Sequence, residues 1–225
     1  MTSGLPGLTR CEGWRSAGHA AGSVSGMQVI LDWDGTATVD DTLILALREF
    51  GDWQVYLDAS AALARGEITL HEEIRRDAES IKTPIDEVVA WLVDNLELRP
   101  GFHELAETYR PLIVSSNFRQ LIEPILDRED VDLEVRANNV KWAPSGWLAT
   151  FRNGDTCGTC GEPCKRADLP TEEEIVYVGD GYSDRCAAQA ADRIFARDGL
   201  ARYLDERGVR YEAFGDLHDV ARSLA

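Results

Sequence analysis

Residues 29–36 read Val-Ile-Leu-Asp-Trp-Asp-Gly-Thr, and this stretch decides the fold. Its three leading apolar residues, two of them β-branched, predict a strand that is buried on both faces, as is typical of a parallel sheet. Asp32 and Asp34 follow at the carboxyl end of that strand, which is where ligands bind in open α/β sheets. The sequence therefore predicts an α/β fold that presents two carboxylates at its binding edge.

The spacing of the two aspartates indicates the chemistry. Alternation along an extended chain places Asp32 and Asp34 on the same side, where two carboxylates repel each other. A Mg²⁺ ion bound by carboxylates and substrate phosphate oxygens relieves that repulsion. Asp32 is then free to attack phosphorus, and Asp34 to act first as a general acid and then as a base. The alternative is a strand that ends in an Asx-type turn, because Asp and Gly are common in turns.

Composition narrows the class of protein. The chain has 225 residues, 44% of them hydrophobic, which fits one domain with an insertion or a domain with a cap. Its formal net charge of −17 argues against nucleic acid or an anionic membrane as the partner. Residues 1–26 are rich in Gly, Ser and Ala and lack the apolar core of a secretory signal, and we expect them to form a disordered tail or an over-extended start. An odd number of cysteines, five, favours reduced thiols and a cytoplasmic location.

Helical patterns fill residues 41–98. Thr69 with Glu72 three residues later predicts a helix start, and apolar residues from Ile85 to Leu96 recur at helical spacing. Such a block is too long for a simple crossover between the first two strands. We therefore predict a helical cap at 41–98 that closes over the site and excludes water, and a catalytic core formed by 27–40 and 99–225.

Two later strands also end in polar residues. Residues 111–117 form an apolar run that ends in Ser-Ser-Asn, and residues 175–184 run through a strand into Gly-Asp-Gly-Tyr-Ser-Asp. The glycines allow a tight turn around Asp180, which completes the predicted Mg²⁺ site. Asp184 lies in the first turn of the next helix, where it either holds Lys165 in place or acts through metal-bound water.

A cysteine-rich segment precedes the last strand-end motif. Residues 157–165 read Cys-Gly-Thr-Cys-Gly-Glu-Pro-Cys-Lys, which has the spacing of a zinc site, although a structural site needs four ligands. Cys186 and His218 are the candidates for the fourth ligand. The favoured interpretation is a glycine-rich loop that carries reduced thiols. Residues 131–152 predict a short β excursion with a packing role alone.

The motifs, taken in order, resemble those of a known family. Asp-x-Asp-Gly-Thr at 32–36, the strand-end Ser115, Lys165 and Gly-Asp-Gly-x-x-Asp at 179–184 resemble the four motifs of the haloacid dehalogenase (HAD) superfamily of phosphohydrolases. The resemblance implies a HAD-like Rossmannoid parallel sheet flanked by helices. A helical cap inserted between the first two core strands is similar to the phosphoserine-phosphatase-like branch. Segments that are similar to the methionine-salvage phosphatases are residues 66–69, 157–165 and 195–198.

The resemblance also implies roles for individual residues. Asp32 is the nucleophile, Asp34 the acid and base, and Lys165 offsets charge on the phosphoryl oxygens. Ser116 and the residue after it stand where the branch usually has Gly-Gly, whose backbone amides contact phosphate. The implied metal residues are Asp32, Asp34 through its backbone carbonyl, Asp180 and Asp184, and the implied substrate contacts are Ser115, Ser116, Lys165, Asp41 and Arg76.

These observations predict a Mg²⁺-dependent phosphomonoesterase that hydrolyses a small phosphorylated metabolite through an aspartyl-phosphate. One alternative is a phosphonate-cleaving hydrolase of the same superfamily, in which Lys82 forms a Schiff base. A phosphomutase is another. The alternative from a different class is a regulatory module that binds a phosphorylated metabolite without turnover. Mg²⁺-dependent hydrolysis of p-nitrophenyl phosphate, quenched by a chelator, separates the enzymes from that module.

Overall fold

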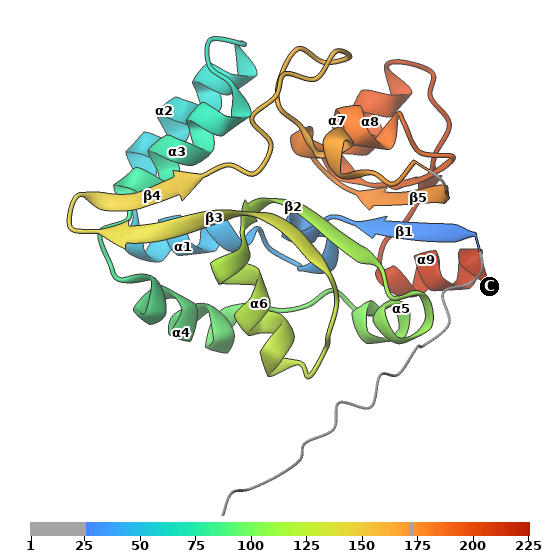
Figure 1. Ribbon diagram of the computed structural model, residues 1–225, viewed down its shortest axis with the longest axis horizontal. Helices are drawn as coiled ribbons and strands as arrows, with labels where there is room; N and C mark the ends of the chain where they lie inside the picture. The colour runs from blue at the N-terminus through green and yellow to red at the C-terminus, as the bar shows by residue number, and fades with distance from the viewer. Residues whose placement is uncertain (1–25, 172) are drawn as a thin grey trace, which may run out of the picture.

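The computed structural model describes residues 26–171 and 173–225 (Figure 1), so the predicted tail, apart from Gly26, lies outside the described residues. A seven-stranded sheet in the order β4-β3-β2-β1-β5-β6-β7 forms the centre of the molecule. Neighbouring strands are parallel except for the β3–β4 hairpin, which is antiparallel. The strands are β1 Met27–Leu31, β2 Leu112–Phe118, β3 Val135–Ala143, β4 Gly146–Thr150, β5 Glu174–Gly179, β6 Arg193–Ala196 and β7 Glu212–Ala213.

The strand predicted from residues 29–36 lies in the middle of this sheet. Val29 and Leu31 of β1 face one hydrophobic cluster and Ile30 faces a second, so both faces of the strand are buried. Helices α5, α6 and α9 contribute to the first cluster and α7 and α8 to the second, which gives three layers (Figure 1). The helices are α5 Phe102–Tyr109, α6 Arg119–Arg128, α7 Arg185–Ala188, α8 Asp198–Asp205 and α9 Leu217–Leu224. The predicted α/β class is confirmed.

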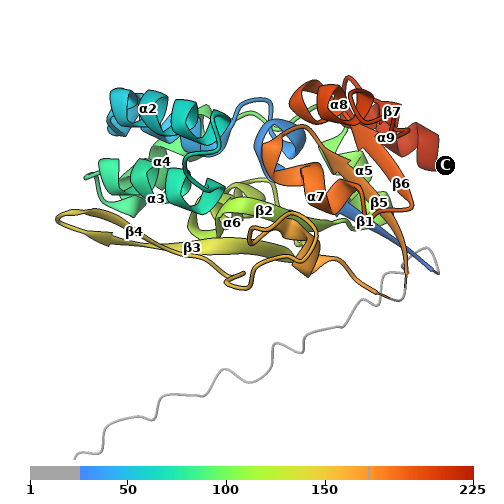
Figure 2. The same cartoon turned by 90° about the horizontal axis from the view of Figure 1, so that it is seen from above.

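Four of the five helices between β1 and β2 lie within residues 41–98, where the sequence predicted helices. They are α1 Thr42–Phe50, α2 Trp53–Ala64, α3 Leu70–Ser80 and α4 Ile85–Asn95. Asp41 caps α1 by accepting from the amide of Ile44 at 2.9 Å, and Thr69 caps α3 by accepting from the amide of Glu72 at 3.2 Å. The helices lie beyond the carboxyl end of β1, with α2 and α3 on one side of the sheet and α4 beside α6 on the other (Figures 1 and 2).

The β3–β4 hairpin, predicted only as a short β excursion, is part of the central sheet. It extends the sheet by two strands and packs against α3. Trp147 is fully buried and donates from its amide to Ile81 at 3.2 Å and from its indole to Thr83 at 2.8 Å. The indole of Trp142 donates to the next carbonyl, that of Lys82, at 2.9 Å. The hairpin thus holds the segment that joins α3 to α4.

A membrane-crossing helix is not found in the part of the chain that the structure describes, because each helix there is too short or too polar to span a bilayer.

Candidate active site

A tight turn carries the first aspartates away from β1. Residues Trp33–Ala37 form this turn, in which Gly35 adopts a φ of +71°. A Cβ atom at Gly35 would lie 2.5 Å from Oδ2 of Asp180, so glycine is required both by the backbone conformation and by the close approach. The buried Trp33 anchors the turn, since its indole donates to the hydroxyl of Thr42 at 3.0 Å. The turn therefore brings the ends of β1 and β5 together.

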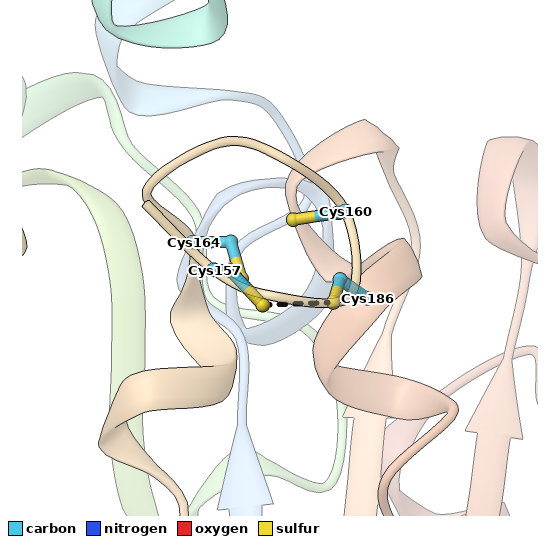
Figure 3. Close-up of side chains that lie close together, drawn as sticks. All are labelled: Cys157, Cys160, Cys164 and Cys186. Carbon is cyan, nitrogen blue, oxygen red and sulfur yellow. Dashed lines mark hydrogen bonds between the residues drawn. The ribbon is translucent and has the colours of Figure 1, made fainter. Parts of the chain in front are cut away.

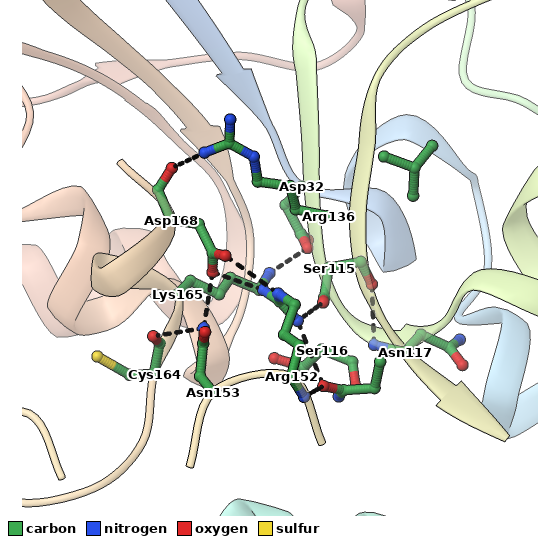
Figure 4. A network of polar contacts seen from close by, with 12 residues as sticks. Asp32, Ser115, Ser116, Asn117, Arg136, Arg152, Asn153, Cys164, Lys165 and Asp168 are labelled. Carbon is green, nitrogen blue, oxygen red and sulfur yellow. Dashed lines mark hydrogen bonds and ion pairs between the residues drawn. The ribbon is translucent and has the colours of Figure 1, made fainter. Parts of the chain in front are cut away.

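A buried lysine joins two of the predicted carboxylates. Nζ of Lys165 donates to Oδ1 of Asp32 and, at 2.8 Å, to Oδ1 of Asp184. Figure 4 shows Lys165 reaching from its loop to Asp32 at the end of β1. Burial lowers the pKa of Lys165, but the adjacent Asp184 and Asp32 outweigh it and leave that pKa above its usual value. The ammonium group is therefore charged and matched by carboxylates on both sides.

Asp184 acts as an organiser of these contacts. Its Oδ1 also accepts from the hydroxyl of Tyr177 at 2.7 Å. Its Oδ2 accepts from the amides of Asp180 and Gly181 at 3.0 and 2.9 Å. Protein donors thus satisfy both oxygens, which supports the predicted role of holding Lys165 rather than the role through metal-bound water.

A cluster of carboxylates meets the requirements of a hard cation. Single oxygens of Asp32, Asp180 and Asp184 lie within 4.8 Å of one another. Burial and then Asp184 raise the pKa of Asp32 well above its usual value, and the same two causes raise the pKa of Asp180 to about 6. The crowding is costly without positive charge, and carboxylate oxygens are the ligands that Mg²⁺ prefers. The donor set therefore fits this ion.

Asp34 points toward β2 instead of into that cluster. Its Oδ1 accepts from the amide of Thr42 at 2.8 Å and from Nδ2 of Asn117 at 3.1 Å, while its Oδ2 accepts from the hydroxyl of Ser115 at 3.3 Å. Burial raises the pKa of Asp34 above its usual value, although hydrogen bonds from Thr42 and Asn117 lower it in part. A carboxyl group with a raised pKa is suited to general acid catalysis.

Arg152 holds the backbone of β2 at Ser115. Arg152 donates to the carbonyl of Ser115 at 2.7 Å and forms a two-pronged ion pair with Asp168, at 3.1 and 2.7 Å (Figure 4). Nδ2 of Asn138 donates to the carbonyl of Ser116 at 2.6 Å. Ser115 itself is fully buried, with its hydroxyl turned toward Asp34. These bonds fix the backbone of the predicted Ser-Ser-Asn motif.

A cavity of about 590 Å³ lies beside these groups. Asp41 lines it and has a pKa raised well above its usual value, first by burial and then by the charge of Asp34. Two arginines, Arg185 and Arg202, also line the cavity and supply positive charge. The predicted residues found in the cavity wall are Asp32, Asp34, Asp41, Ser116 and Asp180.

Ser115, Lys165 and Asp184 lie behind the cavity wall, in contact with residues that form it, whereas Arg76 lies away from these groups. Its guanidinium pairs with Glu72 at 2.8 Å, and 44% of its side chain is exposed. Glu73, Ile74 and Asp77 of the same helix line the cavity, whereas Arg76 is absent from its wall. The structure therefore gives no support to the predicted contact of Arg76 with substrate, because the position of a residue in a helix does not by itself tell which face meets the cavity.

Other site residues were missed. Asn117, Thr42 and Tyr177 each donate to a predicted carboxylate, and Arg152 supports Ser115. Asn117 had a signal in the sequence, since it follows the two serines at a strand end. The others gave none, because their contacts depend on segments far apart in the chain.

The fold and the site define a Rossmann-like α/β enzyme in which aspartates gather at strand ends beside a cavity. Residues 29–189 match the family described as haloacid dehalogenase-like hydrolase, and the chain belongs to this family. The resemblance drawn from the motifs is thus confirmed.

Named relatives extend this finding. The chain is 26% identical to 2-hydroxy-3-keto-5-methylthiopentenyl-1-phosphate phosphatase of Bacillus cereus strain AH187, over 88% of this chain and 95% of that protein. It is 28% identical to the bifunctional enzyme MtnB/MtnX of Bacillus licheniformis, over 87% of this chain and 48% of that protein. The name of the B. cereus relative bears out the expectation of a phosphatase-type enzyme.

Solved structures share the fold. A phospho-aspartyl intermediate analogue of phosphoserine phosphatase superposes with a TM-score of 0.64 at 18% identity, covering 88% of this chain and 98% of the other. Phosphoserine phosphatase from T. onnurineus gives a TM-score of 0.64 at 20% identity, covering 88% and 94%. At such identities the similarity concerns the fold alone.

Proposed function

We propose that the chain hydrolyses a small phosphorylated metabolite as a Mg²⁺-dependent phosphomonoesterase. The observation that supports this most is the convergence of Asp32, Asp34 and Asp180 on one cavity, with the ammonium group of Lys165 bonded to Asp32. The B. cereus relative is named as the phosphatase of a phosphorylated metabolite, which supports this proposal. The expected cytoplasmic location stays a prediction.

The first chemical step belongs to Asp32 and Asp34. A carboxylate oxygen of Asp32 attacks phosphorus, a new oxygen–phosphorus bond forms, and the bond to the ester oxygen breaks. Asp34 gives its proton to the departing alkoxide, so the alcohol leaves neutral. The raised pKa of Asp34 supports this role, since the carboxyl must hold a proton until the bond breaks.

The second step returns the enzyme to its starting state. Asp34, now a carboxylate, takes a proton from water, and the hydroxide attacks the phosphorus of the aspartyl-phosphate. The bond between Asp32 and phosphorus breaks, which releases inorganic phosphate. Asn117 and Thr42 keep the carboxylate of Asp34 in one orientation for both steps.

Positive charge makes the attack on an anionic phosphate feasible. Lys165 supplies a charged ammonium next to Asp32, and Asp184 keeps that ammonium in position. The residues that would hold Mg²⁺ are Asp32, the backbone carbonyl of Asp34 and Asp180. The chemistry that a bound Mg²⁺ supplies is neutralisation of these carboxylates and of the phosphate oxygens.

We also propose that residues 41–98 act as a cap over the site. Leu43, Ile44 and Leu47 of α1, together with residues of α2 and α3, line the cavity that the catalytic aspartates share. A substrate that fills this cavity displaces the water that would compete with Asp32 as the nucleophile in the first transfer. The shape of the cavity wall formed by these helices is then what selects the substrate.

The phosphonate-cleaving alternative is less well supported. It requires a lysine in the cap, and Lys82 is the single lysine of residues 41–98. Nζ of Lys82 donates to the carbonyls of Glu79 and Ser145, and Lys82 is absent from the cavity lining. The lysine needed for a Schiff base therefore lies away from the aspartates.

Hydrolysis assays test the proposal. We expect p-nitrophenyl phosphate and members of a panel of phosphorylated metabolites, phosphoserine and the methionine-salvage intermediate included, to be hydrolysed with Mg²⁺ and spared with EDTA. Asp32→Asn should abolish turnover while Asp94→Asn, an exposed change on α4, leaves it intact. Transfer of the phosphoryl group to a second sugar would favour the phosphomutase, and binding without turnover would favour the regulatory module.

A further inference from the structure

Four cysteines that the proposed reaction does not use lie together behind Lys165. The sulfur atoms of Cys157, Cys160, Cys164 and Cys186 are all within 4.8 Å of one another, and each thiol is free. Figure 3 shows three of them on one loop and Cys186 on α7, with their side chains turned toward a shared space. The sequence had favoured a loop of unliganded thiols and left the fourth ligand open.

The separation of the sulfurs matches a tetrahedral metal site. With Zn–S bonds of about 2.3 Å, neighbouring sulfurs in a tetrahedron lie about 3.8 Å apart. The sulfurs of Cys157 and Cys186 are 3.8 Å apart. A disulfide requires about 2.05 Å. We propose that Cys157, Cys160, Cys164 and Cys186 bind one structural Zn²⁺ ion.

Cys186 is the fourth ligand in this arrangement, and His218 is not. The imidazole Nδ1 of His218 pairs with Glu104 at 2.6 Å, where α9 meets α5, and His218 is absent from the group of potential ligands. Cys186 is buried at the start of α7, while Cys160 on the loop is exposed. One ligand is thus rigidly placed on a helix and three come from a turn that folds over it.

The loop is shaped to present its sulfurs. The amide of Gly161 donates to the carbonyl of Cys157 at 2.9 Å, and Gly161 has a φ of +80°, which closes a tight turn between the first two cysteines. The amide of Thr159 donates to the sulfur of Cys157 at 3.4 Å. Amide donors of this kind offset the negative charge of a thiolate and orient it toward a metal.

The metal would join the two segments that carry the catalytic lysine and its organiser. Cys164 directly precedes Lys165, and Cys186 lies two residues after Asp184. Residues 151–164, between β4 and the turn of Lys165, contain neither helix nor strand, which is a long stretch for a compact domain. A bound zinc would fix this stretch to α7.

The site has a structural rather than a catalytic character. Four protein sulfurs fill a tetrahedron and leave no position for water or substrate. Binding breaks S–H bonds, releases those protons to solvent and forms Zn–S bonds, with no change of oxidation state. The carboxylate cluster of Asp32 and Asp180 offers oxygen ligands instead and suits a harder ion. Zn²⁺ would therefore bind at the thiolates and Mg²⁺ at the carboxylates.

Metal content of the purified full chain tests the inference. Purified with reductant and dialysed against EDTA, the protein should retain zinc at a one-to-one ratio by inductively coupled plasma mass spectrometry. Cobalt exchanged into the site should give the visible absorption of tetrahedral thiolate coordination. A chain without zinc that also takes up neither zinc nor cobalt after full reduction would overturn the inference, and so would a chain that carries iron in place of zinc.

Variants add a matched comparison. Cys160→Ser, at the exposed corner of the cluster, should weaken zinc retention against a chelator by at least about tenfold. Cys11→Ser should leave zinc content unchanged, because the four clustered thiols already complete the tetrahedron. Asp32→Asn should lose phosphatase turnover yet keep its zinc, which separates a failure of this inference from a failure of the proposed function. Equal zinc loss in the Cys11 and Cys160 variants would contradict the assignment.

Discussion

Nζ of Lys165 lies 2.8 Å from Oδ1 of Asp184, and both side chains are almost completely buried. The same nitrogen also contacts Asp32, so a single ammonium serves two carboxylates from different strand ends. A buried charge without a partner is unfavourable. Removal of one member of a buried ion pair therefore destabilises the fold, because the remaining charge stays buried without compensation. The lysine is therefore expected to stabilise the fold as well as the reaction.

Lys165→Met should reveal both roles. It leaves Asp32 and Asp184 buried without their cation, so we expect the free energy of unfolding to fall by roughly 3–5 kcal/mol and kcat/KM to fall by at least about 100-fold. Urea unfolding and steady-state kinetics measure the two effects. Lys141→Met, at an exposed position of β3, should stay within about 0.5 kcal/mol of the wild type. Unchanged unfolding in the Lys165 variant would show that the ion pair is unimportant for stability.

Comparison of Gly35→Ala with Gly66→Ala separates the effect of backbone strain from the effect of a steric clash with Asp180. Both glycines have a φ of +71°, but an added Cβ would lie 2.5 Å from Oδ2 of Asp180 at Gly35 and in open space at Gly66. Each variant should lose about 1 kcal/mol of stability from backbone strain. Gly35→Ala alone should displace Asp180 and raise the Mg²⁺ concentration needed for half-maximal activity. Equal metal dependence in the two variants would exclude Asp180 from the metal site.

Asp77 should make stability depend on pH. Its side chain is 3% exposed, its Oδ1 lacks a hydrogen-bond partner, and burial followed by the charge of Glu73 raises its pKa from 3.8 to about 7. The folded chain therefore holds a proton between pH 4 and 7 that the unfolded chain has lost, so this group lowers stability as pH rises through that window. Asp77→Asn should be more stable than the wild type at pH 8, by roughly 1.4 kcal/mol for each unit of pKa shift, and similar to it near pH 4.

Urea unfolding at several pH values, with the exposed Asp94→Asn as the control, checks this prediction. A constant difference between the Asp77 variant and the wild type from pH 4 to 8 would mean that Asp77 does not titrate in this range.

Two tryptophans of the hairpin form a matched pair. The indoles of Trp147 and Trp142 donate to the neighbouring carbonyls of Thr83 and Lys82, but Trp147 is fully buried and Trp142 is 45% exposed. Trp147→Phe removes a hydrogen bond that a fully buried indole makes and should cost about 1–3 kcal/mol, whereas water replaces the lost bond in Trp142→Phe. Thermal unfolding compares them. If both variants were equally destabilised, the bond from Trp147 would not be what holds the segment between α3 and α4 to the hairpin.

The fold and part of the site could be predicted from local patterns in the sequence. The apolar strand before Asp32 and the glycines around Asp180 are local features, and the structure brings both ends to one cavity. The four helices of residues 41–98 followed from their periodicity and from the helix start predicted at Thr69. Parallel strands end at the same edge of a sheet, which is why strand-end residues could be grouped without coordinates.

The rest depends on how distant segments pack. Arg152 reaches Ser115 across 37 residues, and Trp147 reaches Thr83 across 64, so neither contact leaves a local pattern. The side of α3 that faces the cavity is set by packing, so the sequence position of Arg76 did not show that it lies outside the cavity wall. Cys186 follows Cys164 by 22 positions, and spacing alone could not choose it over His218.

Trapping the phosphorylated enzyme tests the central claim most directly. The chain is mixed with substrate and Mg²⁺, quenched rapidly in acid and digested, and the phosphoryl group is located by mass spectrometry. The account predicts that it resides on Asp32 and is absent from Asp32→Asn. A phosphoryl group on a different residue, or turnover with no phosphorylated peptide at any quench time, would contradict it.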